Sequence, residues 1–148
     1  MAITQAVCDS FKVELLEGEH DFRSSGGDAF KLALYDASAT LSNTTTAYTT
    51  TNEVGASGSY AAGGGALTNT GAAGTGATAY IDFSDISFTS ATISAQAAVI
   101  YNSNTSATTN TNAAVMVLDF GGVKTSTAGT FTITFPTNDS SSAILRLS

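Results

Sequence analysis

Residues 130–135 read Thr130-Phe131-Thr132-Ile133-Thr134-Phe135, and they form the clearest strand pattern in the chain. Its three apolar side chains alternate strictly with three threonines, and successive side chains of a β-strand point to opposite faces. The pattern therefore predicts a strand with one face in a core and the other toward solvent or a partner. Pro136, the single proline of the chain, has no backbone N–H to donate and is expected to end this strand.

Short alternating or β-branched segments also occur on both sides of this strand, separated by clusters of Gly, Asn and Ser. The two longest predict buried strands that form a hairpin around a loop at 102–112. The predicted strands cover 30–34, 79–83, 86–88, 91–101, 113–120, 130–135 and 143–147, with weaker candidates at 48–54 and 65–68. About seven to eight strands in one chain predict a mainly β fold, either a β-sandwich or a jelly roll.

A different periodicity precedes the strands. Residues 4–17 carry a broad apolar stripe and predict one N-terminal amphipathic helix, with Thr4 as its N-cap and Gly18 as its C-terminal cap. A helix of this length is marginal alone and needs a surface, either its own sheet or another subunit. Four of its apolar side chains are the predicted interface residues: Val7, Phe11, Leu15 and Leu16.

The length of 148 residues fits a single domain, which the change of periodicity divides into an N-terminal helical arm, 1–26, and a β-sandwich body, 27–148. Residues 55–77 and 102–112 are rich in Gly, Ala, Ser, Thr and Asn and predict flexible loops at the ends of the sandwich.

Charge is sparse and uneven along the chain. Only 11% of the residues are charged, less than half of the ~25% typical of soluble domains, and the net charge is −7. Five cations cannot neutralise many phosphates, which argues against binding to nucleic acid or to an anionic membrane. Weakly charged surfaces rich in Thr, Ser and Ala are common where a protein contacts neighbours. No apolar run has the length of a membrane span, so we expect a protein made in a cytoplasm.

The residue types that carry catalysis are scarce. The single histidine, His20, lies in the acidic turn Glu19-His20-Asp21 and is predicted to be a solvated turn residue. The single cysteine, Cys8, is expected to be a small buried apolar side chain. Two such residues cannot form a structural zinc site.

Acidic residues offer the remaining candidates for chemistry. Asp82 with Asp85, and Asn138 with Asp139, do not match a calcium-binding loop and are predicted to be turn residues. Convergence of Asp82, Asp85 and Asp119 as a glycosidase pair stays open. The sequence therefore predicts a protein that is not an enzyme and has no cofactor and no metal.

Several phrases of this sequence together resemble a family of small structural proteins of tailed bacteriophages. The first runs from Gly27-Asp28-Ala29-Phe30-Lys31-Leu32-Ala33-Leu34-Tyr35 through Asp36 to Leu41, Thr46-Ala47-Tyr48 and Thr51-Asn52-Glu53-Val54. The later ones are Ala98-Val99-Ile100-Tyr101-Asn102, Ala114 to Phe120, Thr127 to Pro136, and Ala143-Ile144-Leu145-Arg146. The resemblance spans nearly the whole chain except the loops 55–77 and 105–112.

This resemblance implies a virion protein, with capsid decoration, also called cement, as the first expectation. It implies that the major capsid protein and sister copies in a homotrimer are the partners, and that the helix docks on the shell or on a sister subunit. The alternative is a structural or binding module associated with the tail, neck or fibre of the particle, because the loops of a sandwich make good recognition surfaces.

Overall fold

The computed structural model describes residues 2–104 and 109–148, and it is built mainly of antiparallel strands. Strands hold 46% of the residues and helix 6%. In chain order the elements are β1 (Ala6–Val7), α1 (Asp9–Leu16), β2 (Phe30–Tyr35), β3 (Gly65–Ala66), β4 (Ala73–Thr75), β5 (Thr78–Ile81), β6 (Ile86–Asn102), β7 (Ala114–Ile133) and β8 (Leu145–Leu147). The predicted fold class, a mainly β chain consistent with a β-sandwich of about eight strands and one N-terminal helix, is confirmed.

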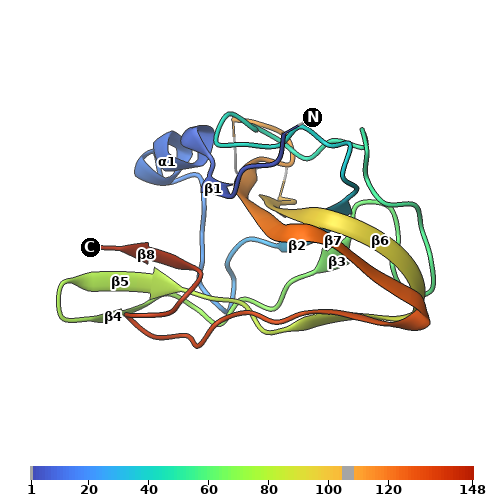
Figure 1. Ribbon diagram of the computed structural model, residues 1–148. Coiled ribbons are helices and arrows are strands. Elements are labelled where there is room, and N and C mark those ends of the chain that lie inside the picture. Colours follow the sequence, from blue (N-terminus) through green and yellow to red (C-terminus); the bar gives the residue numbers. More distant parts are fainter. Residues whose placement is uncertain (1, 105–108) are drawn as a thin grey trace.

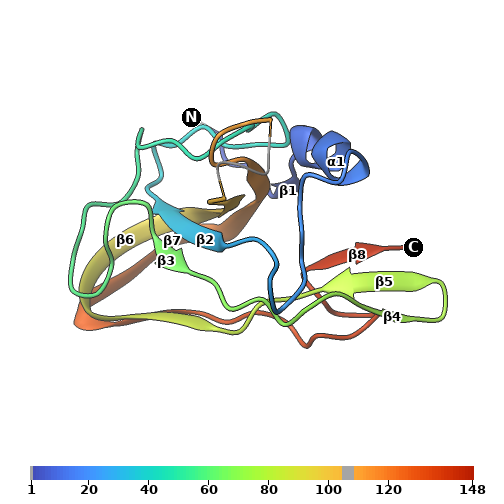
Figure 2. The ribbon, with the colours of Figure 1, turned by 180° about the vertical axis from the view of Figure 1, so that it is seen from behind.

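A single long hairpin of β6 and β7 organises the larger sheet, whose strand order is β1-β7-β6-β2-β3. The pairing runs from Tyr101 opposite Ala114 to Ile86 opposite Ile133. The register shifts at several bulges along the way, and the backbone φ is positive at Ser90, Gly121 and Ala128. Bulges bend and twist a hairpin, and this one curves over so that its two halves lie in different layers (Figure 1; Figure 2 shows the reverse side).

The predicted hairpin is therefore confirmed, but its strands are longer than expected. The segments 86–88 and 91–101 form one strand, and most of 113–120 and of 130–135 belongs to another, which begins at Ala114 and ends at Ile133, three residues before Pro136. The periodicity is interrupted at the bulges, although the backbone pairing continues through them. The predicted loop at 102–112 lies partly outside the described residues.

Three short strands form the second sheet, in the order β4-β5-β8, and β8 lies between β5 and the helix (Figure 1). A row of aromatic rings connects the two sheets to the helix. Phe22 stacks on Phe30 with ring centroids 4.5 Å apart, and Phe83 lies 5.8 Å from both Phe30 and Phe135. Because Phe11 contacts Phe22 at 6.0 Å, the row begins on α1. The core is therefore one continuous cluster.

The N-terminal segment differs from the predicted helix at 4–17. Ala6 and Val7 pair with Val117 and Met116 of β7, so the backbone is extended there and Thr4 cannot be the N-cap. Cys8 takes the N-cap position without a side-chain cap bond. Gly18 follows the last helical turn with a φ of +78°, as predicted for a C-terminal cap. Since Cys8, Phe11 and Phe22 belong to the core, the described part of the N-terminal arm packs into the body.

The Gly-rich region 55–77, predicted to be flexible loops, is partly ordered by pairing and burial. It contains β3 and β4, and Tyr60 is buried at 1% exposure. The segment 48–54, a weak strand candidate, has only an isolated bridge from Glu53 to Tyr35. The sequence did not predict the ordered part of this region, because Gly, Ala and Ser have small side chains and produce little hydrophobic periodicity.

Candidate functional site

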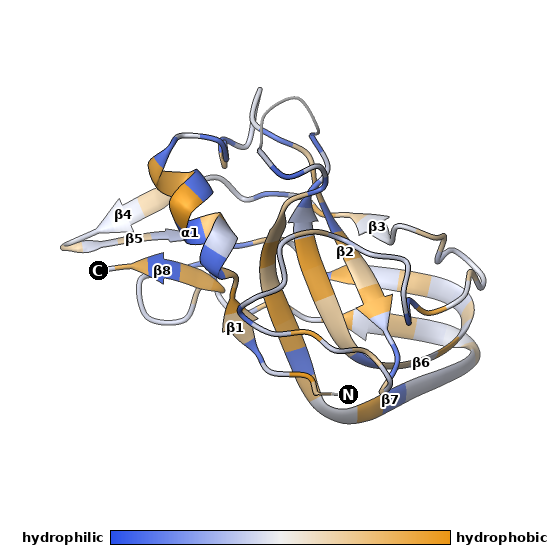
Figure 3. Cartoon of the chain, turned by 90° about the horizontal axis from the view of Figure 1, so that it is seen from above, coloured by the Kyte–Doolittle hydropathy of each residue, from blue (hydrophilic) through white to orange (hydrophobic). Residues whose placement is uncertain are grey.

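An apolar groove lies between α1 and β8 and is the best candidate for a functional surface; we call it the helix groove. It has a volume of about 370 Å³, and its lining consists of Val7, Phe11, Lys12, Leu15, Leu16, Leu145, Arg146 and Leu147. Figure 3 shows the apolar residues of α1 beside β8. The two walls come from opposite ends of the chain.

Hydrogen bonds at the start of α1 hold one wall of the groove in place. The Cys8 backbone N–H donates to the Val115 carbonyl at 3.0 Å, and the Asp9 N–H donates to the Asn43 carbonyl at 2.8 Å. The Asn43 side-chain amide in turn donates to the Asp9 carboxylate at 2.6 Å. These contacts satisfy N–H groups that a helix leaves unpaired at its first turn, so the short helix has a fixed position.

All four predicted interface residues line the helix groove, although they differ in exposure. Phe11 is 1% exposed and forms the floor, so it belongs to the core of its own chain. Val7 and Leu15 are half-buried, whereas Leu16 is 90% exposed at the rim. Leu147 across the groove is 53% exposed. An assembly role for these residues remains a prediction, and Leu16 is the one most available to a partner.

Two of the five cations of the chain stand at this groove. Lys12 pairs with Asp9 at 2.8 Å, and both side chains are more than half exposed. That pairing lowers the pKa of Asp9 below its ordinary value. Arg146 lines the opposite wall, where its guanidinium donates to the Ser141 carbonyl. An apolar groove with cationic rims suits a segment that combines apolar and acidic side chains.

A buried polar cluster lies beneath the helix and includes His20. The prediction of a solvated turn histidine is wrong: His20 is 7% exposed, and its Nε2 lies 2.8 Å from the Glu14 carboxylate. The ring packs against Phe11 with centroids 4.9 Å apart. The turn that carries His20 folds back under α1. The acidic residues next to His20 in the sequence did not indicate that its side chain would be buried.

The other candidate chemical groups serve structural roles. Cys8 is fully buried as predicted, and burial raises the pKa of its thiol to about 12. Asp82 is buried, and its carboxylate accepts the Phe83 N–H at 2.8 Å. Asp139 accepts the N–H groups of Ser141 and Ser142, as expected of a turn residue. In residues 2–104 and 109–148 no three potential ligands among His, Cys, Asp and Glu come together as a metal site.

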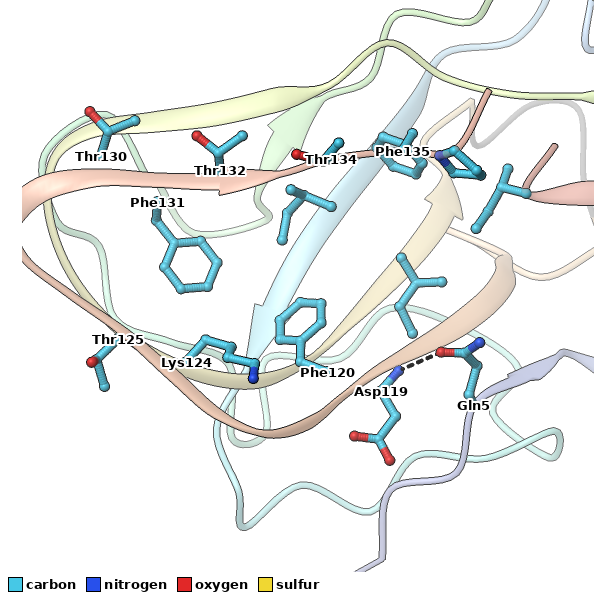
Figure 4. Close-up of a pocket in the computed structure, with 14 residues that line it drawn as sticks. Gln5, Asp119, Phe120, Lys124, Thr125, Thr130, Phe131, Thr132, Thr134 and Phe135 are labelled. Carbon is cyan, nitrogen blue, oxygen red and sulfur yellow. Dashed lines mark hydrogen bonds between the residues drawn. The ribbon is translucent and has the colours of Figure 1, made fainter. Parts of the chain in front are cut away.

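A second, larger groove follows the open edge of β7, and we call it the sheet groove. It has a volume of about 570 Å³ and is lined mainly by residues 118–120, 124–125 and 130–136, with Gln5 and Ile144. Figure 4 shows Phe120 and Phe131 pointing into it, while Thr130, Thr132 and Thr134 point away. The Asp119 N–H donates to the Gln5 side chain at 3.2 Å. The alternation of 130–135 thus has the predicted two faces.

Several residues of the helix groove were not foreseen from the sequence: Lys12, Leu145, Arg146 and Leu147. Leu145 and Leu147 lie in the predicted last strand, and nothing in their spacing indicates that it meets the helix. Only the pairing of β8 with β5 brings that end of the chain to α1.

Comparison with known proteins gives no further guidance, since no family model, no curated protein and no solved structure matches this chain. Among the described residues, no helix has both the length and the apolar character needed to cross a bilayer.

Proposed function

We propose that this chain is a non-enzymatic structural protein of a bacteriophage virion. In this proposal it is a capsid decoration protein that stabilises the head shell. The helix groove takes an apolar and acidic segment of the major capsid protein, and sister copies associate as a homotrimer.

The observation that carries the proposal is Leu16. It is 90% exposed at the rim of an apolar groove, next to Leu147 at 53% and on the same helix as Val13 at 56%. Large aliphatic side chains gathered beside a concave apolar surface are typical of an interaction site. A single exposed leucine would need no explanation, but a cluster on one end of the molecule favours docking.

The charge distribution favours a partner segment with acidic side chains. The molecule has a net charge of −7, yet Lys12 and Arg146 both line the helix groove. Lys12 is already paired with Asp9, so Arg146 is the cation that attracts an acidic partner segment to this groove, while the net negative charge of the molecule disfavours its docking elsewhere.

The absence of an enzymatic role is supported by what the polar groups already do. His20 and Glu14 contact each other, and His20 also contacts Asn102, so the one histidine is enclosed in a structural network. The virion assignment draws on the resemblance of residues 27–54 and of the later strand phrases to tailed-bacteriophage structural proteins. A sparsely charged surface suits a protein surrounded by neighbours.

The variant Leu16→Glu tests docking. Purified particles assembled with this variant should contain about tenfold fewer copies per major capsid protein than wild type, because a buried anchor is replaced by a charge. Val123→Glu is the matched control: Val123 is also exposed, at 48%, but lies outside the helix groove. Both variants should melt at the wild-type temperature.

The contrary outcomes are distinct. Wild-type incorporation of Leu16→Glu would overturn docking through the helix groove. A shift of the free protein from oligomer to monomer would show that a second copy occupies the groove instead of the shell. Removing residues 1–18 is a poorer test, because it also deletes Cys8 and Phe11 from the core.

The sheet groove favours a second candidate, a module of the tail, neck or fibre. Its aromatic floor and an open strand edge could accept an extended segment of another tail protein. Copy number in the intact particle, measured by cryo-microscopy, separates the two roles. A decoration protein follows the symmetry of the shell, with on the order of hundreds of copies, whereas a tail or neck component is present in far fewer.

A further inference from the structure

Three segments of the chain meet at His20. Its Nε2 lies 2.8 Å from Glu14 Oε2 on α1, and its Nδ1 lies 3.1 Å from Asn102 Nδ2 at the end of β6. Phe11 and Phe22 pack on the ring with centroids 4.9 and 6.4 Å away. The His20 side chain is 0% exposed, so its ring is shielded from bulk solvent.

The orientation of the Asn102 amide is fixed by its other partners. Its Oδ1 accepts the backbone N–H of Asn104 at 2.9 Å, and its Nδ2 donates to the Asp28 carboxylate at 2.7 Å. Exchanging the oxygen and nitrogen would place like groups against both partners. The second hydrogen of Nδ2 therefore points at His20 Nδ1, which must be an acceptor.

The protonation state of the imidazole follows from this orientation. With Nδ1 as acceptor, the ring is neutral and carries its proton on Nε2, which donates to Glu14. Adding a proton to Nδ1 sets a ring N–H against the Asn102 N–H, so the contact between the turn and β6 is lost. Rotating the amide to accept that proton would break its bonds to Asn104 and Asp28.

The charged groups around His20 are carboxylates. Glu14 approaches it from α1, Glu19 and Asp21 flank it in the turn, and Asp28 lies on the far side of Asn102, before β2. On β6, the hydrogen-bond partner of the ring is the neutral Asn102. Glu14 can accept from Nε2 in either protonation state of the ring, whereas the Asn102 N–H can donate only to the neutral ring.

We propose that His20 is a proton-sensitive latch between the helix and the long hairpin. At neutral pH the neutral ring bridges Glu14 and Asn102. On acidification the imidazolium keeps its bond to Glu14 and releases Asn102, which loosens α1 and its turn from the end of β6. Because α1 forms one wall of the helix groove, acid changes the support of that surface. The inference holds whatever partner binds there.

Nitrogen NMR of the wild-type protein tests the latch directly, because His20 is the single histidine and gives one set of ring signals. At about pH 8 the spectrum should show the neutral tautomer with the proton on Nε2. On titration to about pH 5, the Asn102 side-chain amide should shift together with the ring. A proton on Nδ1 at pH 8, or an Asn102 amide that does not follow the ring, would overturn the proposal.

The variant His20→Gln separates the latch from general effects of acid. A glutamine amide can donate to Glu14 and accept from Asn102, but it does not titrate in this range. Wild-type protection against hydrogen exchange of the Glu19 N–H, which donates to the Glu14 carbonyl at 2.9 Å in the turn, should fall about tenfold between these pH values, because the turn loosens when its contact with Asn102 is lost. In His20→Gln it should stay constant. An equal fall in both proteins would show that His20 is not the sensor.

Discussion

The phenol oxygen of Tyr60 lies 2.8 Å from the backbone nitrogen of Leu34 and accepts its hydrogen bond, while the same hydroxyl donates to Glu53 at 2.9 Å. Both Tyr60 and Leu34 are buried. A residue from a Gly-rich segment thus satisfies a backbone group of β2 that water cannot reach.

Replacing Tyr60 with Phe should lower the free energy of unfolding by about 2 kcal/mol, because the Leu34 N–H would remain buried without an acceptor. Tyr80→Phe is the matched control. Among the described residues, the Tyr80 hydroxyl has only a long, exposed contact of 3.4 Å with Thr75, so its loss should cost under about 0.5 kcal/mol. Urea denaturation measures both, and equal losses would contradict the role given to Tyr60.

Glu14→Ala should destabilise the fold by about 3 kcal/mol, since it removes a buried acceptor from His20 and from Asn110 at once. Glu17→Ala, an exposed change at the end of the same helix, should stay within about 0.5 kcal/mol of wild type. Thermal and urea denaturation of the pair provide the comparison. A small effect of Glu14→Ala would mean that the buried network adds little stability.

Gly64→Ala should be among the most damaging small changes in the chain. A Cβ there would lie 1.9 Å from the Leu32 carbonyl oxygen, and φ is +79°. We expect a loss of about 3 kcal/mol or more. Gly121→Ala shares the positive φ, at +71°, but meets nothing within 4 Å, so only the backbone cost of about 1 kcal/mol applies. Similar losses for both would show that the backbone near Gly64 moves aside easily.

Burial raises the pKa of Asp82 above its ordinary value, and the neighbouring Asp85 adds to the effect. Because the folded pKa exceeds the unfolded one, the contribution of Asp82 to stability is present below the unfolded pKa and is lost as the pH rises through the folded pKa. Asp82→Asn removes this titration. The stability of the variant relative to wild type should therefore improve from acid to neutral pH.

Asp139→Asn should behave in the opposite way. Hydrogen bonds from the Ser141 and Ser142 N–H groups lower the pKa of Asp139, so its contribution is present above the unfolded pKa and is lost as the pH falls. The variant should lose stability relative to wild type as the pH rises. Urea denaturation from acid to neutral pH measures the free energy of unfolding of each variant relative to wild type. If this difference does not change with pH for Asp82→Asn, the pKa of Asp82 is not raised in the folded protein.

Cys8 should react with a thiol reagent only when the chain unfolds. It is fully buried, and burial, helped by Asp9 and Glu14, raises its pKa to about 12. At about pH 8 its labelling should be at least about a thousandfold slower than in urea-unfolded protein. Fast labelling without denaturant would show local opening at the start of α1.

Sequence patterns predict those parts of the fold that depend on neighbouring residues in the chain, such as a strand with alternating side chains or a glycine at a helix end. The alternation at 130–135 and at 30–34 predicted strands, and Gly18 predicted the end of the helix, because these signals are local. The start of the helix was misplaced because Ala6 and Val7 pair with β7, a contact between distant parts of the chain. Propensity carries no information about such a partner.

In the candidate site, too, local sequence signals were predicted and contacts between distant parts of the chain were not. The apolar residues Val7, Phe11, Leu15 and Leu16 were found from spacing, and all four line one groove. The second wall, with Leu145 and Leu147, depends on the order of strands in the smaller sheet. His20 was misjudged because its burial is set by Glu14 and Asn102, the latter 82 positions along the chain.

The helix groove also has a consequence for biosynthesis. One wall is made early, from residues 7–16, and the other only when residues 145–147 leave the ribosome. Even β1 has to wait for β7 before it can pair. A nascent chain that has not yet reached residues 145–147 therefore cannot present this surface, so the groove forms after the helix and not with it.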